Sequence, residues 1–309
     1  MTSWRIGIDL GGTKIEGVVL DAGGQILAKW REPSPRDDYA ATIAAIAGLV
    51  TRLEAMAGVV ATAGVVATVG VGVPGSIHPA TGLVQGANSI WLNGQPLGRD
   101  LEARVGRPVR LANDANCFAL SEAVDGAAAG ARSMFGVIVG TGCGGGLVFE
   151  GRLIDGPNAI GGEWGHNPLP WASADEHPGP ECWCGRRGCM EMWISGTGLS
   201  ADHARVTGEA LTAEQIARRA GSGDVAAIAT LERHAERFAR GLAHVINIFD
   251  PHVIVLGGGL SKLAGLYDTL PGLTAPHVFA TAPKVVIRPP RWGDASGVRG
   301  AAWLWGNRD

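Results

Sequence analysis

Two glycine-turned hairpins, one in each half of the chain, constrain the fold more than any other feature of the sequence. Residues 6–21 read IGIDLGGTKIEGVVLD, in which two alternating apolar runs flank Gly11 and Gly12. Residues 135–151 repeat the plan, with FGVIV and LVFEG on either side of GTGCGGG. Apolar alternation broken by glycines is typical of a strand, a tight turn and a second strand. The repeat predicts a duplicated architecture of two α/β lobes whose hairpins point to a shared interlobe cleft.

Strand-like and helix-like segments alternate along the rest of the chain, which is the pattern of an α/β fold. We expect strands at residues 26–30, 68–73 and 109–111, and helices at residues 40–57, 115–129, 212–219, 225–248 and 298–305. The predicted lobes are a smaller N-terminal lobe of residues 1–115 with 298–309, and a larger C-terminal lobe of residues 116–297.

Glycine is over-represented, with 48 residues in a chain of 309, whereas an average usage of about 7% would give roughly 22. The glycines follow no three-residue period, which excludes a collagen-like helix. The apolar content of 46% and the net charge of −3 exclude a disordered chain. Many glycines gather where a backbone without Cβ could approach a phosphate, a sugar or a nucleotide: Gly7, Gly11, Gly12, Gly140, Gly142, Gly144, Gly145, Gly146, Gly161, Gly162, Gly165, Gly257, Gly258 and Gly259.

The two hairpin turns are candidates for phosphate binding. Each has a threonine beside its glycines, Thr13 or Thr141, and a turn without Cβ atoms can point backbone N–H groups at an anion. No helix-like segment follows Gly145, which argues against a dinucleotide-binding loop, and the spacing of a Walker A loop is missing. A plain tight hairpin remains the alternative for either turn taken alone.

Two further features favour a nucleotide site. Asp9 lies inside an apolar strand, and a buried carboxylate needs a partner such as Mg²⁺ or a bound water. A third glycine cluster follows the apolar run 253–256, although an ordinary connection from strand to helix explains that cluster equally well. The predicted nucleotide and phosphate residues are Asp9, Gly11, Gly12, Thr13, Lys14, Thr141, Gly142, Gly257, Gly258 and Gly259.

Asp114 is the candidate catalytic carboxylate. The sequence LANDAN places it where a short strand gives way to a helix, and ligands of α/β folds bind at the carboxyl ends of strands. Helix capping by Asn113 and Asp114 is the alternative, and it is compatible with catalysis. Glu163 and His166 lie among glycines in GGEWGHN, and Glu191 follows the last cysteine. These groups suit the hydroxyls of a sugar, although a surface loop with incidental polar residues would also carry them.

The spacing of the cysteines indicates a metal site. Cys182, Cys184 and Cys189 form the pattern C-x-C-G-x-x-G-C, and three thiolates need a fourth ligand for tetrahedral zinc. His166 is one candidate for that ligand and His177 is the other. Four protein ligands leave no open position, so the predicted zinc is structural. The remaining cysteines are expected to be small packing residues: Cys117 and Cys143.

The charge balance and the distribution of apolar residues limit the kinds of partner and the cellular compartment that we expect for this chain. Lysine and arginine total 26 against 29 acidic residues, which gives no broad nucleic-acid footprint. No uninterrupted apolar run reaches about 18 residues, and the N-terminal sequence MTSWRIGIDL lacks the apolar core of a signal peptide. We therefore expect a cytoplasmic protein with reduced thiols that binds neither nucleic acid nor membrane.

Together these motifs resemble the ROK family of sugar kinases and repressors, which share the actin/hexokinase (ribonuclease H-like) fold. The resemblance spans the chain and is carried by DLGGTK at 9–14, the pair Asn113-Asp114, GTGCGGG at 140–146, EWGH at 163–166 and the cysteine cluster through Glu191. Four further segments resemble the bacterial fructokinases of the manno/fructokinase type: PRDDY at 35–39, NSIWLNGQP at 88–96, HNPLPW at 166–171 and GAAWLW at 300–305.

The resemblance implies a homodimeric kinase that uses ATP and Mg²⁺ and phosphorylates the 6-hydroxyl of D-fructose to give fructose 6-phosphate. It implies Asp114 as the catalytic base and the following sugar contacts: Gly75, Asn93, Asn113, Asp114, Glu163, His166 and Glu191. Glucose, mannose and N-acetylglucosamine are the alternative hexoses. A ROK-type sugar-responsive repressor is a remote alternative, because the first hairpin begins by Ile6 and leaves no room for an N-terminal helix-turn-helix.

Overall fold

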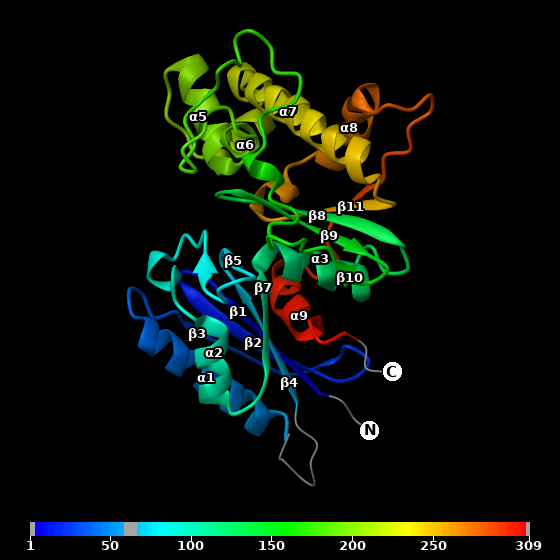
Figure 1. The fold of residues 1–309 in the computed structure, drawn as a ribbon. Coiled ribbons are helices and arrows are strands. Elements are labelled where there is room, and N and C mark those ends of the chain that lie inside the picture. Colours follow the sequence, from blue (N-terminus) through cyan, green and yellow to red (C-terminus); the bar gives the residue numbers. More distant parts are fainter. Residues whose placement is uncertain (1–3, 59–66, 307–309) are drawn as a thin grey trace. The chain divides into compact units, whose positions relative to one another are not determined.

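The computed structural model describes residues 4–58 and 67–306 (Figure 1). Residues 1–3, 59–66 and 307–309, which the predicted N-terminal lobe includes, lie outside the described residues. The chain divides into two compact units. The first unit runs to Gly130 and also includes Gly146–Gly161 and the chain from Arg291 onwards; the second consists of Ala131–Gly145 and Gly162–Pro290.

A five-stranded sheet of order β3-β2-β1-β4-β7 forms the centre of the first unit. The antiparallel strands are β1 (Arg5–Leu10), β2 (Lys14–Leu20) and β3 (Ile26–Pro33), and the strands parallel to β1 are β4 (Thr68–Val73) and β7 (Val109–Asn113). A separate antiparallel pair consists of β5 (Ser76–Ile77) and β6 (Val84–Gln85). The predicted first hairpin is confirmed, since β1 and β2 pair along their whole length.

Helices cover both faces of this sheet (Figure 1). They are α1 (Tyr39–Met56) and α2 (Leu97–Val105) on one face, and α3 (Asp114–Val124) and α9 (Ser296–Trp303) on the other. Successive residues of a strand point to opposite faces. Accordingly Val19 of β2 packs in the core with α1 and α2, while Val18 and Leu20 pack in the core with α3 and α9.

Among the described helices, α1 is long and apolar enough to cross a membrane by composition, with a mean hydropathy of 1.2. A core helix of a globular protein passes the same test. The buried residues Ile46, Leu49, Val50 and Leu53 recur at helical spacing and join the sheet core, so packing accounts for the apolar face of α1.

Glycines allow α9 to lie directly on the sheet and against α3. A Cβ at Gly7 would lie 2.1 Å from the carbonyl oxygen of Val298, and a Cβ at Gly70 would lie 1.9 Å from that of Ala301. A Cβ at Gly300 of α9 would lie 1.6 Å from the carbonyl oxygen of Cys117 in α3. The expectation that Gly7 serves a ligand is therefore wrong, because the space beside it is filled by the backbone of α9.

Buried polar contacts also tie α3 to the segment that leads into α9. The carboxylate of Glu122 accepts hydrogen bonds from Ser296 Oγ at 2.7 Å and from the backbone N–H groups of Arg291 at 2.9 Å and Trp292 at 3.2 Å. For this reason α3 and residues 291–297 belong to the first unit, whereas the sequence analysis assigned them to the larger lobe.

The second unit contains a second five-stranded sheet, of order β10-β9-β8-β11-β12. Its strands are β8 (Ser133–Val139), β9 (Cys143–Phe149), β10 (Arg152–Leu153), β11 (Val253–Gly257) and β12 (Ile287–Arg288), of which β10 and the later part of β9 fall within the first unit. The first sheet has the same strand order. In each sheet, the three strands that come first in sequence are adjacent, and the two later strands lie on the other side of the earliest strand and run parallel to it. The predicted duplication is thus confirmed at the level of strand order.

Helices of the second unit are α4 (Glu191–Ile194), α5 (Gly196–Thr207), α6 (Ala213–Gly221), α7 (Val225–Phe249) and α8 (Leu266–Thr274). Short 3-10 helices across the two units are Ile90–Leu92, Trp164–His166, Gly259–Lys262, Ala275–His277 and Gly293–Ala295. The predicted helices matching α6 and α7 differ from them by at most two residues at each end. Three helices were not predicted from the sequence: α2, α5 and α8, which are 9 to 12 residues long and contain glycine.

A buried ion network on α7 holds the loop of residues 171–180, which contains Glu176. Glu176 of this loop accepts from Arg237 Nε at 2.7 Å and from Arg240 Nη1 at 2.9 Å, and Arg237 also pairs with Asp202 of α5 at 3.0 Å. Burial alone would raise the pKa of Glu176, but the two guanidinium groups hold it at about 2. The loop and α5 are therefore fixed to the same helix.

Candidate active site

Two of the predicted carboxylates, Asp9 and Asp114, lie close enough in the first unit to influence each other. Asp9 is on β1, opposite Glu16 of β2, and Asp114 is the first residue of α3. Burial first, and then the negative charges of Asp114 and Glu16, raise the pKa of Asp9 from 3.8 to about 6. The surface of Asp114 is exposed, yet dense protein around it limits its hydration, and this desolvation raises its pKa above the ordinary value.

The raised pKa of Asp9 makes a prediction about stability. The folded chain holds this proton more tightly than the unfolded chain, so the contribution of Asp9 to the free energy of unfolding falls as pH rises from about 4 to about 6. The Asp9→Asn variant has no carboxyl group to ionise at this position, so it does not lose this stability as pH rises. We expect the variant to be more stable than wild type at pH 7 by about 2–3 kcal/mol, and equally stable at pH 3.5. Thermal unfolding at both pH values is the measurement, and a variant less stable at pH 7 would contradict the assignment.

Asn113 and Asp114 both cap α3, as the capping alternative predicts. The side-chain oxygens of Asn113 and Asp114 each accept a hydrogen bond from the backbone N–H of Ala115 at 2.8 Å. Asn113 Nδ2 donates to the carbonyl oxygen of Gly75 at 3.0 Å. The pair is thereby fixed at the junction of β7 and α3.

Two predicted sugar contacts shape their own loops. Asn93 accepts from Ala87 N at 2.9 Å and donates to Ala87 O at 2.8 Å, so its amide pins the loop that contains both residues. Gly75 has φ +73, and a Cβ there would lie 2.4 Å from the carbonyl oxygen of Gln85. The described contacts account for both residues, and their role as sugar ligands stays a prediction.

The turn between β1 and β2 is open to solvent. Gly11 N donates to Lys14 O at 3.0 Å, which closes the turn, while Gly12, Thr13 and Lys14 are exposed. A Cβ at Gly12 would meet a single atom within 4 Å, Ser89 Oγ at 3.9 Å. The geometry leaves room for an anion beside this turn, as the sequence predicts.

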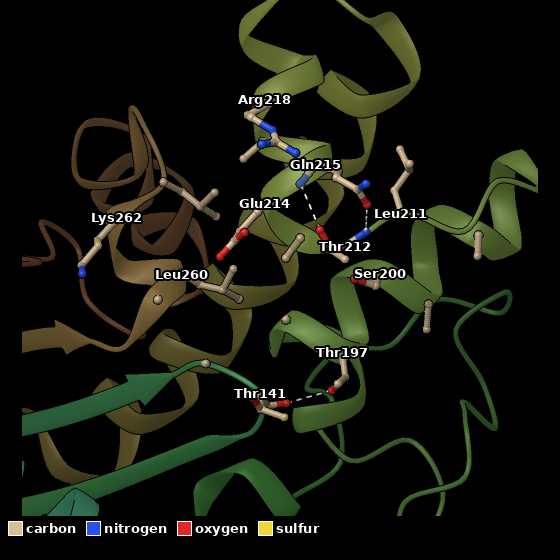
Figure 2. A pocket seen from close by; sticks show the side chains of 18 of the residues that line it. Thr141, Thr197, Ser200, Leu211, Thr212, Glu214, Gln215, Arg218, Leu260 and Lys262 are labelled. Carbon is tan, nitrogen blue, oxygen red and sulfur yellow. Dashed lines mark hydrogen bonds between the residues drawn. The ribbon is translucent and has the colours of Figure 1, made fainter. Parts of the chain in front are cut away.

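The second unit contains a pocket of about 1220 Å³ at the turn between β8 and β9 (Figure 2). Gly140 and Thr141 of this turn line it together with residues of α5, of the connection that leads into α6, of α6 itself and of the 3-10 helix after β11: Thr197, Ser200, Leu211, Thr212, Glu214, Gln215, Arg218, Gly259, Leu260 and Lys262. Figure 2 shows Thr141 and Thr197 at one end and Arg218 at the other, with Glu214 between them. Hydroxyls, both signs of charge and leucine side chains therefore face one space.

The start of α5 is joined to this turn. Gly196 N donates to Gly140 O at 2.7 Å, and Thr197 Oγ1 donates to Thr141 O at 2.9 Å. The N–H groups of Gly196 and Gly198 at the start of α5 are thereby engaged by Gly140 O and Ser195 Oγ, and the positive end of the helix dipole lies beside Thr141.

The predicted glycines of the second unit divide by what surrounds them. Gly140 and Gly259 line the pocket, and a Cβ at either would meet nothing within 4 Å. Gly258 has φ +83, and a Cβ there would lie 2.3 Å from Val139 O. A Cβ at Gly142 would lie 2.8 Å from Glu191 Oε2, and Gly257 ends the buried strand β11. Of these five glycines, only Gly140 and Gly259 therefore combine a place in the pocket wall with open space for a ligand beside them.

The sequence analysis missed the pocket residues on α5 and α6. One signal was present, since Ser195 opens a second glycine-rich segment, SGTG, and caps α5 by accepting from Gly198 N at 3.1 Å. A capping box joins Thr212 and Gln215 at the start of α6. These signals mark where helices begin, but they do not reveal that both helices border one pocket.

Glu191 and His166 lie near each other beside the cysteine cluster. Glu191 begins α4, and its two carboxylate oxygens accept from Trp183 Nε1 at 2.8 Å and from Cys143 N at 2.9 Å. The rings of His166 and Trp183 meet edge to face, with centroids 4.9 Å apart. Glu163 is exposed next to the short helix that carries His166.

The segment GEWGH is held on β8 and β9 by its tryptophan. Trp164 is buried, its Nε1 donates to Gly144 O at 3.1 Å, and its ring meets that of Phe135 at 5.4 Å. A Cβ at Gly165 would lie 2.3 Å from Cys143 O. This glycine therefore brings the histidine segment close to the strand rather than serving a ligand directly.

The four donors of the predicted metal site converge. The ligand atoms of His166, Cys182, Cys184 and Cys189 all lie within 4.8 Å of one another. His166 Nδ1 is 3.6 Å from Cys182 Sγ, and the Sγ atoms of Cys184 and Cys189 are 3.6 Å apart. Tetrahedral zinc with bonds near 2.3 Å places sulfur ligands about 3.8 Å apart, so the donor set fits this ion. His166 rather than His177 is the histidine of this group among the described residues.

Comparison with known proteins identifies the class. Residues 5–308 match the ROK family, and the chain belongs to this family. It is 39% identical over 306 residues to an N-acetyl-D-glucosamine kinase of Pasteurella multocida, covering 97% of this chain and 99% of that protein. It is 41% identical over 304 residues to an N-acetyl-D-glucosamine kinase of Vibrio cholerae, covering 96% of this chain and 98% of the relative.

Solved structures agree with the predicted fold class. The ROK hexokinase of Thermus thermophilus superposes with a TM-score of 0.86 at 33% identity, covering 97% of each chain. A ROK family glucokinase of Streptomyces griseus in complex with glucose and AMPPNP superposes with a TM-score of 0.77 at 28% identity, covering 98% of this chain and 99% of that one. The α/β fold of the actin/hexokinase class is thus confirmed.

The narrower resemblance to fructokinases is not supported. Both curated relatives above are N-acetyl-D-glucosamine kinases, and further relatives at 38–41% identity have the same name. These findings favour one of the alternative hexoses over fructose.

Proposed function

We propose that this chain is an ATP-dependent kinase that phosphorylates the 6-hydroxyl of N-acetyl-D-glucosamine. The observation that carries the proposal is the similarity of 39–41% to N-acetyl-D-glucosamine kinases over nearly the full length of both chains. The proposal replaces D-fructose, our sequence-based substrate, by one of the alternatives stated beside it.

The pocket of the second unit supports nucleotide binding. The part lined by Gly140, Thr141 and Thr197 at the N-terminus of α5 suits phosphates, since hydroxyl groups and the positive end of a helix dipole favour anions. The carboxylate of Glu214 suits the two hydroxyls of a ribose, and the apolar side chains of Leu211 and Leu260 suit a base. The exposed β1–β2 turn of the first unit, with Lys14, is proposed as a second phosphate contact.

Asp114 is proposed as the catalytic base. Its carboxylate would accept a hydrogen bond from the 6-hydroxyl, orient it and take up its proton as the new bond to phosphorus forms. The raised pKa of this carboxyl makes it a stronger base than an ordinary aspartate. Mg²⁺ bound with ATP would neutralise the charge of the phosphates, and the half-buried Asp9 supplies the oxygen ligand that this ion prefers, directly or through water.

Sugar recognition is assigned to Asn113, Glu163, His166 and Glu191. Each can accept or donate a hydrogen bond to a hydroxyl, and buried polar groups matched to a substrate reject analogues that leave them unpaired. His166 would use Nδ1 for the metal and keep Nε2 for the sugar, since Nδ1 is the atom nearest Cys182.

The test is a panel of sugars in a coupled ADP-release assay: N-acetyl-D-glucosamine, D-glucose, D-mannose and D-fructose. We expect kcat/KM for N-acetyl-D-glucosamine to exceed that for fructose by at least about tenfold. A higher kcat/KM for fructose would return the substrate to the fructokinase interpretation, and no ADP release with any hexose would reject the kinase.

Zinc is proposed as a structural ion in the cysteine cluster. We expect purified protein to contain one zinc per chain and Cys184→Ser to lose it, because a thiolate ligand is removed. Cys117→Ala, a buried cysteine outside the cluster, is the control and should keep its zinc. Metal analysis with thermal unfolding checks this, and well under one zinc per wild-type chain would refute it.

The proposed cellular compartment follows from the need for ATP and for reduced cysteines. ATP and reduced thiols are both available in the cytoplasm, which we propose as the compartment. A homodimer remains a prediction from the family resemblance.

A further inference from the structure

Trp183 contacts two of the residues assigned to the sugar. Its indole Nε1 donates to Glu191 Oε1 at 2.8 Å, and its ring lies edge to face with His166 at 86° between planes. The residue is 70% exposed and stands between Cys182 and Cys184. The Trp183 ring therefore lies outside the hydrophobic core, and its side-chain contacts are those with Glu191 and His166.

The carboxylate of Glu191 is held by one donor on each oxygen. The donor to Oε2 is the backbone N–H of Cys143 on β9, whose place is fixed by the sheet. The donor to Oε1 is the side chain of Trp183. A carboxylate has about four acceptor positions, so about two remain for other donors. The direction of these remaining positions depends on both existing bonds.

We propose that Trp183 is a positioning residue for sugar binding, which holds the Glu191 carboxylate in the orientation that accepts two neighbouring hydroxyls of the hexose. The inference rests on the proposed function, in which Glu191 contacts the sugar. It also gives the cysteine cluster a consequence beyond the fold, since the cluster fixes the backbone on both sides of the indole.

Loss of the indole N–H should affect binding of the sugar in particular. Hydrogen bonds to charged groups are the stronger ones, and without the donor the Glu191 side chain regains rotational freedom that sugar binding must then remove. Asp114 and the nucleotide pocket are untouched by this change. A contact made equally in the ground state and the transition state alters KM and leaves kcat unchanged.

The test compares Trp183→Phe with Trp171→Phe. The first variant keeps an aromatic ring beside His166 and removes the N–H. The second is a matched control in the same unit, because Trp171 is 55% exposed and stacks on His277 at 5.3 Å. We expect Trp183→Phe to raise KM for N-acetyl-D-glucosamine about tenfold, with kcat and KM for ATP within about twofold of wild type. Trp171→Phe should leave all three unchanged.

Two further measurements separate positioning from damage to the cluster. Zinc content and thermal unfolding of Trp183→Phe should match wild type; loss of zinc would overturn the proposal. In a Glu191→Ala background, Trp183→Phe should add less than about a twofold change in sugar affinity measured by calorimetry, because its effect passes through Glu191. An unchanged KM in the single variant, or an equal effect in both backgrounds, would also overturn it.

Failure of the proposed function is recognised separately, from the sugar panel on the wild-type protein. If another hexose is the preferred substrate, the substrate assignment fails and the same Trp183 comparison is made with that hexose. If wild type phosphorylates no hexose, both the proposed function and this inference are rejected.

Discussion

Replacing Asp114 by asparagine is expected to lower kcat by about 10²–10⁴-fold, the range typical of a lost general base. The amide oxygen of asparagine can still accept the hydrogen bond from Ala115 N, so α3 keeps its cap. The amide has no basic oxygen to take up the proton of the 6-hydroxyl. We therefore expect KM for the sugar and the unfolding temperature to change little while kcat collapses.

The matched control is Asp155→Asn. Asp155 is an exposed carboxylate of the same unit whose pKa is also raised by desolvation, and it accepts from Asn116 Nδ2 at 3.3 Å. An asparagine there can accept the same bond, so kcat should stay within about threefold of wild type. Steady-state kinetics of both variants with N-acetyl-D-glucosamine is the measurement. A kcat of Asp114→Asn close to that of wild type would show that Asp114 is not the catalytic base.

Substituting alanine for Gly300 is expected to destabilise the first unit by at least about 3 kcal/mol. A Cβ at this position would lie 1.6 Å from the carbonyl oxygen of Cys117, and that oxygen belongs to a helix backbone that cannot rotate aside. The helices α9 and α3 must then move apart. Because α3 begins with Asp114, the displacement should lower kcat as well as stability.

Gly48→Ala is the control, because the same substitution at this position is expected to stabilise the protein. Gly48 lies in α1, is exposed, and a Cβ there would meet nothing within 4 Å. Alanine costs less backbone entropy than glycine in a helix, so we expect a gain of up to about 1 kcal/mol and unchanged kinetics. Thermal unfolding of the two variants measures both effects. Equal stability of Gly300→Ala and wild type would contradict the close packing of α3 and α9.

Local sequence signals predicted the features that depend on neighbouring residues. The β1–β2 hairpin needs only alternating apolar residues around Gly11 and Gly12, and the cap on α3 needs only Asn113 and Asp114 at the end of a strand. The spacing of Cys182, Cys184 and Cys189 likewise brings three ligands together within one short segment.

Features that depend on packing between distant segments were beyond such signals. The wall of the pocket at the β8–β9 turn combines Thr141 with Ser200 and Glu214, which lie together because α5 and α6 pack beside this turn. Gly7 was expected to serve a ligand, but it accommodates α9, which lies about 290 residues further along the chain.

Substrate choice could not be predicted for a related reason. Hexose epimers differ only in the direction of a few hydroxyls, so an enzyme distinguishes them by a few hydrogen bonds. Glu191 is proposed to make some of these bonds, and its carboxylate is held by Trp183 and Cys143. Trp183 and Cys143 both lie within the quoted motifs, but the sequence does not show that their N–H groups meet the two oxygens of Glu191. The segments that resemble fructokinases were therefore a weaker guide than similarity over the whole length of the chain.

The repeated strand order has a consequence for how such chains diversify. In the first sheet, residues 34–67 connect the third strand to the fourth, whereas in the second sheet residues 154–252 make the corresponding connection. The longer connection carries the cysteine cluster, Glu191 and the helices α5, α6 and α7. One sheet thus has a short connection, while the other has at the same topological position a long one that carries the cysteine cluster and most of the proposed sugar contacts. New specificities can arise by changes within that one insertion, without altering the strand pairing that both copies share.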